Sequence, residues 1–80
     1  MQVGRVDMKF SSERLRELRE ERHLGQKEVA AVLGIRINVY QRYEYGERLI
    51  PIDKLMMLAD YYQTSTDYIL GRTDDPKPLD

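Results

Sequence analysis

Cysteine is absent from this chain of 80 residues, and histidine occurs only once, at His23. Without thiols the chain can form neither disulfides nor thiolate metal sites, and one histidine cannot build a multi-histidine metal site or a cysteine–histidine dyad. We therefore expect no metal site, no catalytic residue and no cofactor, and we interpret His23 as an ordinary loop residue. The lack of cysteine also fits a reducing compartment.

Long apolar runs are missing as well. No stretch approaches the roughly 20 apolar residues that span a bilayer, and residues 1–7 lack the apolar core of a signal peptide. We expect a cytoplasmic protein with no membrane partner. The length suffices for one small domain with a modest core, which helical packing must hold together.

A strong charge of either sign is the third absence. The net charge is −1, which taken alone argues against a nucleic-acid-binding protein, because attraction to phosphates needs a basic surface. The charges are unevenly distributed, however. Residues 22–48 carry five basic and three acidic side chains, a net +2, whereas residues 49–80 carry three basic and six acidic ones, a net −3. The first of these stretches is therefore basic enough to be a candidate for DNA contact.

The basic stretch contains two short helical patterns on either side of one glycine. Val29, Ala30 and Leu33 share an apolar stripe, and Gly34 supplies the permissive backbone that a tight turn after a helix requires. At about 100° per residue, the second pattern has an apolar face and a polar face. The apolar face carries Val39, Tyr40 and Tyr43, and the polar face carries Asn38, Gln41, Arg42 and Tyr45. This layout predicts a helix-turn-helix.

Helical patterns also flank this motif, and together they predict an all-α fold of five helices. Ser11 or Ser12 can cap a first helix that runs to about Arg22. Pro51 opens a fourth helix, and Ser65 caps a short fifth one.

These elements divide the chain into three parts. Residues 1–10 form an N-terminal segment without helical period, and residues 11–72 form the helix-turn-helix domain. Residues 73–80 form an acidic, proline-containing tail, which we expect to be solvated.

Four motifs carry a resemblance to a known family. They are Gln26-x-x-Val29-Ala30-x-x-Leu33-Gly34, Tyr43-Glu44-x-Gly46, Pro51-x-x-x-Leu55-x-x-Leu58-Ala59 and Asp67-Tyr68-Ile69-Leu70-Gly71. They cover roughly residues 12–72, so the match is far more specific than a lone turn glycine between two apolar stripes. The chain resembles the Cro/repressor-type helix-turn-helix family of phage and bacterial transcription regulators. This resemblance implies a compact five-helix bundle of the phage-repressor DNA-binding domain type, with the helix-turn-helix at its second and third helices.

The resemblance implies that the helix over about residues 37–45 enters the major groove of DNA and reads bases with its outward face. Asn38 can pair with adenine and Arg42 with guanine, while Gln41 can reach either a base or a phosphate. Ile37 stands where family members often carry a polar reading residue. It can only make an apolar contact, for instance with a thymine methyl group, or else pack at the turn.

The phosphate contacts implied by the resemblance set register and affinity but carry no sequence information. Gln26 begins the second helix, where the family's glutamine reaches a phosphate, and Arg36 stands where the family usually has a capping Ser or Thr. Lys27 and Arg48 add charge at the rim of this surface, and Tyr45 either contacts the DNA backbone or is a bystander.

The resemblance also accounts for an acid on the DNA-facing helix. In this family the glutamate equivalent to Glu44 pairs with a basic side chain of the first helix, and Arg19 stands at the matching position. We expect a partly buried Arg19–Glu44 ion pair with a structural role.

These features predict a sequence-specific transcription regulator that binds double-stranded DNA and represses from a pseudo-palindromic operator as a homodimer. Met56, Met57 and Ile69, together with residues 1–10, supply more apolar positions than a small core needs. The resemblance implies dimerisation through the C-terminal helices, so we expect a dimer formed by the fourth and fifth helices with help from the N-terminal segment. A second hypothesis is a protein-interaction role, such as the antitoxin of a toxin–antitoxin pair. The polar outward face of the reading helix favours DNA, because an interaction surface would more often present an apolar patch. An enzyme is the least favoured class.

Overall fold

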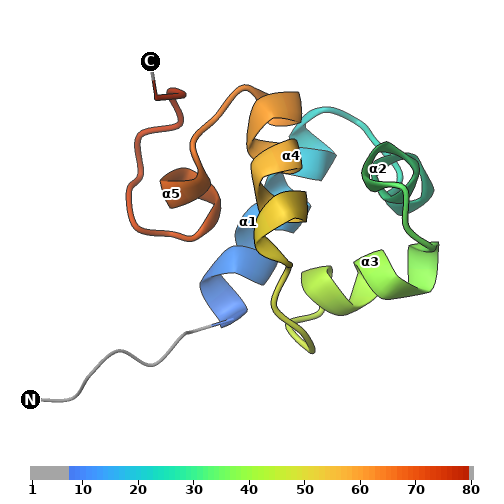
Figure 1. Cartoon of the computed structure of the whole chain (residues 1–80). Coiled ribbons are helices and arrows are strands. Elements are labelled where there is room, and N and C mark those ends of the chain that lie inside the picture. Colours follow the sequence, from blue (N-terminus) through green and yellow to red (C-terminus); the bar gives the residue numbers. More distant parts are fainter. Residues whose placement is uncertain (1–7, 80) are drawn as a thin grey trace, which may run out of the picture.

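The computed structural model describes residues 8–79, which contain five helices and no strand (Figure 1). The helices are α1 (Met8–Glu21), α2 (Gln26–Leu33), α3 (Ile37–Glu44), α4 (Ile52–Tyr62) and α5 (Thr66–Ile69). Figure 1 shows α4 in front of α1, with α2 and α3 on one side of it and α5 on the other. The predicted all-α fold with a helix-turn-helix at α2 and α3 is confirmed. Most of the segment assigned to residues 1–10 lies outside the described residues.

The first helix begins earlier than the sequence predicts. Ser11 and Ser12 are buried inside α1, so the assignment of either as its N-cap was wrong. They lie one turn before Leu15 on the inner face of the helix, where small hydroxyl side chains take positions that apolar residues usually hold. A Cβ atom added at Gly46 would lie 3.5 Å from the Ser12 hydroxyl, so the loop after α3 passes close to this face. Two serines therefore conceal the helical period of the first turns.

One apolar core joins all five helices. It is made of Leu15, Leu18, Val29, Ala30, Leu33, Tyr40, Tyr43, Leu55, Leu58, Ala59, Tyr62 and Ile69. Helical phase assigns Tyr40, Tyr43, Tyr62 and Tyr68 to the core. The first three are buried there and Tyr68 is half-buried against it, while Tyr45 and Tyr61 are exposed. Burial of the α3 tyrosines on one side of that helix fixes which of its side chains face outward.

Arg14 of α1 and Arg22, the residue just after α1, fasten the C-terminal half of the domain. Arg22 Nη2 donates to the Tyr62 carbonyl at 2.9 Å, and its guanidinium lies 4.8 Å from the centre of the Tyr62 ring. Arg14 Nη1 donates to the Tyr68 carbonyl at 3.0 Å, and its guanidinium lies 3.9 Å from the centre of that ring. Each contact combines a hydrogen bond to a late carbonyl of a helix with a cation–π interaction. Both α4 and α5 are thereby held against α1.

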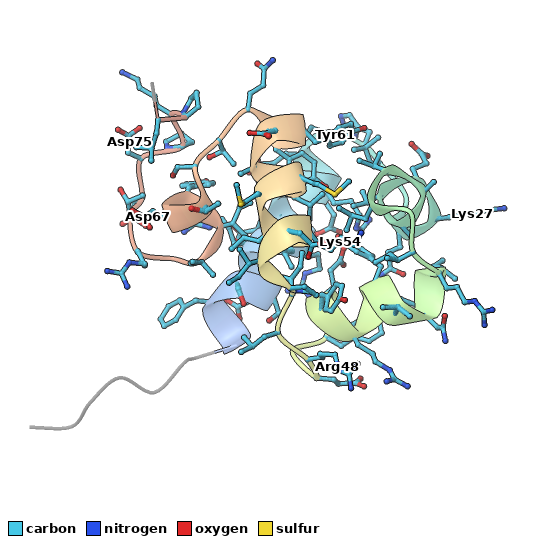
Figure 2. The ribbon with its side chains drawn as sticks, in the orientation of Figure 1. Lys27, Arg48, Lys54, Tyr61, Asp67 and Asp75 are labelled. Carbon is cyan, nitrogen blue, oxygen red and sulfur yellow. The ribbon has the colours of Figure 1, made fainter. Side chains whose placement is uncertain are left out.

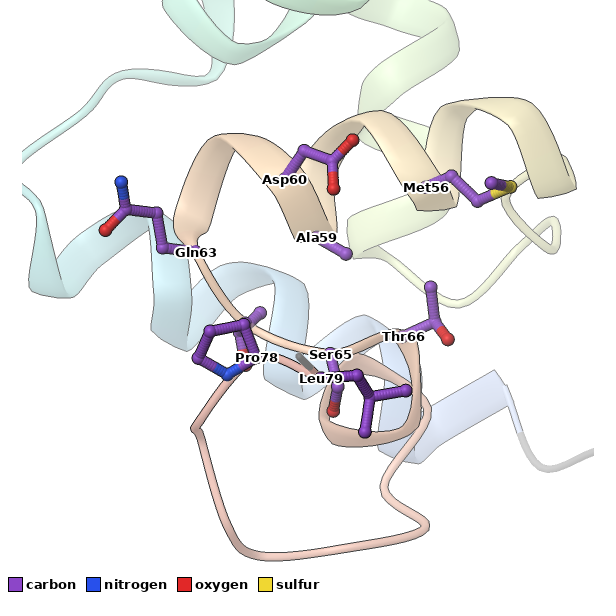
Figure 3. Close-up of a pocket in the computed structure, with 9 residues that line it drawn as sticks. Met56, Ala59, Asp60, Gln63, Ser65, Thr66, Pro78 and Leu79 are labelled. Atoms are coloured by element: carbon purple, nitrogen blue, oxygen red, sulfur yellow. The ribbon is translucent and has the colours of Figure 1, made fainter.

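The segment expected to be a solvated tail is exposed but anchored. Thr64 Oγ1 donates to the Pro76 carbonyl at 2.7 Å, and Arg14 Nη2 lies 3.5 Å from an Asp74 carboxylate oxygen. Pro78 and Leu79 line a pocket of about 380 Å³ between this segment, α4 and the start of α5 (Figure 3). The chain after α5 therefore runs back along the domain. No helix within residues 8–79 is long and apolar enough to cross a membrane.

The turn between α2 and α3 depends on Gly34, whose φ of +68° lies in the left-handed region. Nothing lies within 4 Å of a Cβ atom added there. Gly34→Ala should therefore destabilise the domain by about 1–2 kcal/mol through backbone strain alone. The matched control is Gly25→Ala, because Gly25 has a φ of −84° and an added Cβ would make only ordinary contact with Glu28, at 3.7 Å. Denaturant unfolding measures both, and an equal loss in the two variants would contradict the role of the turn.

Candidate nucleic-acid interface

Helix α3 presents a polar face to solvent because its opposite face is buried. Tyr40 and Tyr43 pack in the core, whereas Asn38 and Arg42 are exposed and Gln41 is half-buried. Both sets follow the helical phase that the sequence shows. The outward face therefore carries two amides and one guanidinium within little more than one turn of the same short helix.

Apolar and aromatic side chains border this face at both ends of α3. Ile37, the first residue of the helix, is 42 % exposed, and Tyr45, its C-cap, is 58 % exposed. The sequence allows Ile37 either a base contact or packing at the turn. Its exposure leaves much of the side chain free to make an apolar contact from the surface.

Exposed basic residues surround α3. Lys27 lies on α2, Arg36 at the N-cap of α3 and Arg48 in the loop after it. Figure 2 shows Lys27 and Arg48 on the side of the molecule formed by α2 and α3, and Asp67 and Asp75 on the other side. Within residues 8–79, none of these three cations is engaged in an ion pair. The uneven charge of the sequence thus becomes a basic surface around α3, which can attract an anion.

A buried ion pair supports α3 from inside. Arg19 Nε donates to Glu44 Oε2 at 2.6 Å, and Arg19 Nη2 donates to Glu44 Oε1 at 3.0 Å, which is the bidentate geometry of a strong pair. Glu44 is 3 % exposed, and Arg19 Nη1 also donates to the Leu24 carbonyl at 2.9 Å. The structure therefore brings together the two residues that the sequence pairs, and it ties the end of α1 to the end of α3.

The Glu44 carboxylate accepts two further hydrogen bonds, so every group that contacts it through a hydrogen bond is a donor. The buried Tyr40 hydroxyl donates to Oε2, and Gln26 Nε2 donates to Oε1 at 3.3 Å. Burial by itself would raise the pKa of Glu44, but the hydrogen bonds from Arg19, Tyr40 and Gln26 outweigh it and hold the pKa below its usual range. Burial and the bond to Glu44 raise the pKa of the Tyr40 hydroxyl. Glu44 is thus a buried anion whose charge is compensated.

The two glutamines of the motif contact each other across the turn. Gln41 Nε2 donates to Gln26 Oε1 at 2.9 Å. Sequence reasoning assigned Gln26 to a phosphate and Gln41 to a base or a phosphate, but it found neither their mutual contact nor the link to Glu44. These residues are 15 positions apart, and no helical period relates positions on two different helices.

Other polar contacts also went unnoticed in the sequence. Arg14 on α1 binds α5, and Arg22, just after α1, binds α4, rather than contributing to the exposed basic surface. The hydroxyl of Tyr62 is buried without a hydrogen-bond partner within the described part of the chain, and burial raises the pKa of Tyr62 to about 12. No group of three or more metal-ligating side chains gathers anywhere in residues 8–79.

The helix-turn-helix family model matches residues 15–69, the span that contains this surface and the ion pair beneath it. This chain belongs to the Cro/repressor-type helix-turn-helix family. The chain is 46 % identical over 66 residues to the uncharacterized HTH-type transcriptional regulator YobD of Bacillus subtilis, covering 82 % of this chain and 59 % of YobD.

Two further relatives have the same kind of name. AnsR of Bacillus subtilis, an HTH-type transcriptional regulator, is 40 % identical over 75 % of this chain and 52 % of its own length. RstR of Vibrio cholerae, a cryptic phage CTXphi transcriptional repressor, is 35 % identical over 84 % of this chain and 62 % of its own length. The chain therefore spans between half and two thirds of these relatives. No solved structure matches it significantly. The family is one of transcription regulators and not of enzymes.

Removal of Glu44 should affect folding strongly. Glu44→Ala leaves the Arg19 guanidinium, the Tyr40 hydroxyl and the Gln26 amide without their common acceptor, and we expect a loss of about 3–5 kcal/mol in the free energy of unfolding. The matched control is Glu47→Ala, which removes an exposed acid in the loop after α3 and should change stability by less than about 0.5 kcal/mol. Thermal or denaturant unfolding at neutral pH compares the two.

The pH dependence provides a second readout of the same variant. Because the folded-state pKa of Glu44 lies below its ordinary value of 4.5, its contribution is complete above about pH 5 and is lost as the pH falls through the folded-state pKa. The stability difference between the wild type and Glu44→Ala should therefore shrink as the pH approaches about 2. A difference that does not change with pH, or is absent at neutral pH, would contradict a buried and charged Glu44.

Proposed function

We propose that this chain is a sequence-specific, double-stranded-DNA-binding transcription regulator of the bacterial or phage type, acting in the cytoplasm, that inserts α3 into the major groove. The observation that carries the proposal is the exposed polar face of α3 inside a rim of cations that form no ion pair within residues 8–79. An α-helix fits the major groove, and base edges there offer a distinct pattern of donors and acceptors at each base pair. The membership of the family and the names of its relatives support the same function.

Base recognition is proposed for the outward residues of α3. Asn38 pairs with adenine through N6 and N7, and Arg42 pairs with guanine through O6 and N7, because amides and guanidiniums match these edges bidentately. Ile37 makes an apolar contact, such as one with a thymine methyl group. Gln41 contributes as well, and its amide is already held by Gln26.

Phosphate contacts are proposed for the residues around this helix. They are Gln26, Lys27, Arg36, Tyr45 and Arg48. The exposure of the three cations supports this assignment, as does the absence of acidic partners for them within residues 8–79. Such contacts position the protein on the duplex and make its affinity depend on salt.

A homodimer on a pseudo-palindromic operator is the proposed assembly, and repression the proposed effect. Helix α4 exposes four large apolar side chains, Ile52 and Met56 on one flank and Met57 and Tyr61 on the other, with Asp53 and Asp60 between them; Ile52 is 76 % exposed. Ile69, which the sequence also suggested for this interface, is instead fully buried in the core. Dimerisation across α4 and the neighbouring α5 would set two reading helices about 34–36 Å apart, so operator half-sites should repeat at about 10–10.5 base pairs.

Selection of bound oligonucleotides from a random pool tests the base-reading assignment. The wild type should yield a consensus, and Asn38→Ala or Arg42→Ala should each relax one base step per half-site, with a loss of about 1–3 kcal/mol in discrimination. Lys27→Ala is the control, because loss of a phosphate contact should weaken binding to all sequences equally and reduce the salt dependence. Recovery of an unchanged consensus with both variants would exclude these two residues as readers, and recovery of no consensus by the wild type would contradict the function itself.

The dimer is tested by a charge on the outer face of α4. Met56→Glu places a carboxylate among the exposed apolar side chains and should shift the chain to a monomer without unfolding it, since Met56 lies outside the core. Ala31→Glu, at an exposed position of α2, is the matched control and should remain a dimer. Light scattering or sedimentation at micromolar concentration measures the mass. A wild type that is monomeric both free and on its operator would contradict the proposed assembly.

A further inference from the structure

Two carboxamides and one carboxylate form a line from the core to the polar face of α3. Glu44 is buried at the end of α3, Gln26 is half-buried at the start of α2, and Gln41 is half-buried on α3. Gln26 Nε2 lies 3.3 Å from Glu44 Oε1, and Gln41 Nε2 lies 2.9 Å from Gln26 Oε1. The inner end of this line is an anion, and its outer end lies among the residues proposed to read DNA.

The anion determines which way each carboxamide is turned. An ionised carboxylate accepts hydrogen bonds and donates none, so Gln26 must face Glu44 with its amide nitrogen. The Gln26 carbonyl oxygen then faces Gln41, which must donate to it through its own amide nitrogen. A rotated Gln26 would place its carbonyl oxygen against a carboxylate that already accepts from Arg19 and Tyr40. The direction of the hydrogen bonds is therefore set by the buried charge.

The orientation of Gln41 limits what it can offer to DNA. One N–H of its amide is used by Gln26, so the carbonyl oxygen and the second N–H remain. An acceptor beside a donor complements adenine, whose major-groove edge has the N6 donor beside the N7 acceptor. Guanine offers only the acceptors O6 and N7 and could bind only the remaining N–H.

We propose that Glu44 and Gln26 are positioning residues that orient the Gln41 carboxamide, so that Gln41 selects adenine over guanine at one base step of each half-site. This proposal rests on the proposed function and goes beyond it, because it assigns part of the sequence specificity to residues that need not touch a base. It also gives Gln26 a role that a phosphate contact alone would not give.

The test compares base preference at each position of the selected operator for three variants. Gln41→Ala locates the step that Gln41 reads, where the preference for adenine over guanine should fall roughly 5- to 100-fold. Gln26→Met, which keeps the length of the side chain but has no amide, should reduce the same preference at the same step. The double variant should lose no more than the larger single loss, because the two residues act as one unit. Lys27→Ala, on the same helix as Gln26, is the control and should weaken all sequences equally.

The role of Glu44 is tested by Glu44→Gln combined with Arg19→Met, which leaves no unpaired buried charge and so favours a folded domain. A neutral amide at position 44 can donate as well as accept, so Gln26 is no longer turned one way and the same base step should relax. Melting curves verify that this variant is folded. An unchanged preference for guanine at the base step assigned to Arg42 verifies that it still binds its operator.

Each outcome bears on one part of the proposal. Uniform weakening by Gln26→Met, with an unchanged consensus, would make Gln26 a phosphate contact only and overturn the proposal. Relaxation by Gln26→Met but not by the folded Glu44 variant would overturn the role of the buried charge. An unchanged consensus in Gln41→Ala would also overturn the proposal, while the proposed function would stand because the wild type still selects a consensus. Absence of any wild-type consensus would instead refute the proposed function.

Discussion

The buried carboxylate of Glu44 is the constraint on which the organisation of this domain depends. A charge at 3 % exposure is tolerable only when donors surround it, and Arg19, Tyr40 and Gln26 supply them from α1, α3 and α2. These donors must therefore stay in place for the fold to be stable. Three helices are thereby fixed relative to one another by one group, and the turn at Gly34 sets the direction in which α3 leaves α2.

The exposed surface follows from this packing. Because the tyrosines of α3 are held in the core, its amides and its arginine must face solvent, and the cations of α2 and of the following loop surround them. Asp67 and Asp75 of the C-terminal half lie away from this surface, as Figure 2 shows. A protein with a net charge of −1 thus presents a local surface suited to a polyanion.

Most of the fold was predictable, and the exceptions have physical causes. Periodicity located four of the helices. Pro51 stands at the N-cap of α4. At the start of α5 the Ser65 side chain accepts a hydrogen bond from the Tyr68 N–H, as its residue type predicts. The start of α1 was missed because serines replace apolar residues on its buried face. Ile69 was misjudged because helical phase does not tell whether an apolar residue meets the core of its own chain or a partner. The anchored course of residues 73–79 depends on contacts with Arg14 and Thr64, which are distant in sequence.

The sequence by itself determined the class of fold, the helix that carries the exposed polar face and, through the family motifs, the partnership of Arg19 with Glu44. These properties are encoded locally, in periods of 3.6 residues, in cap residues and in motif spacing. Only the tertiary structure decided that Gln26 and Gln41 contact each other and that Glu44 holds Gln26. The physical reason is that hydrogen bonds between helices depend on the angle and distance at which those helices pack, and the packing of the whole core sets both.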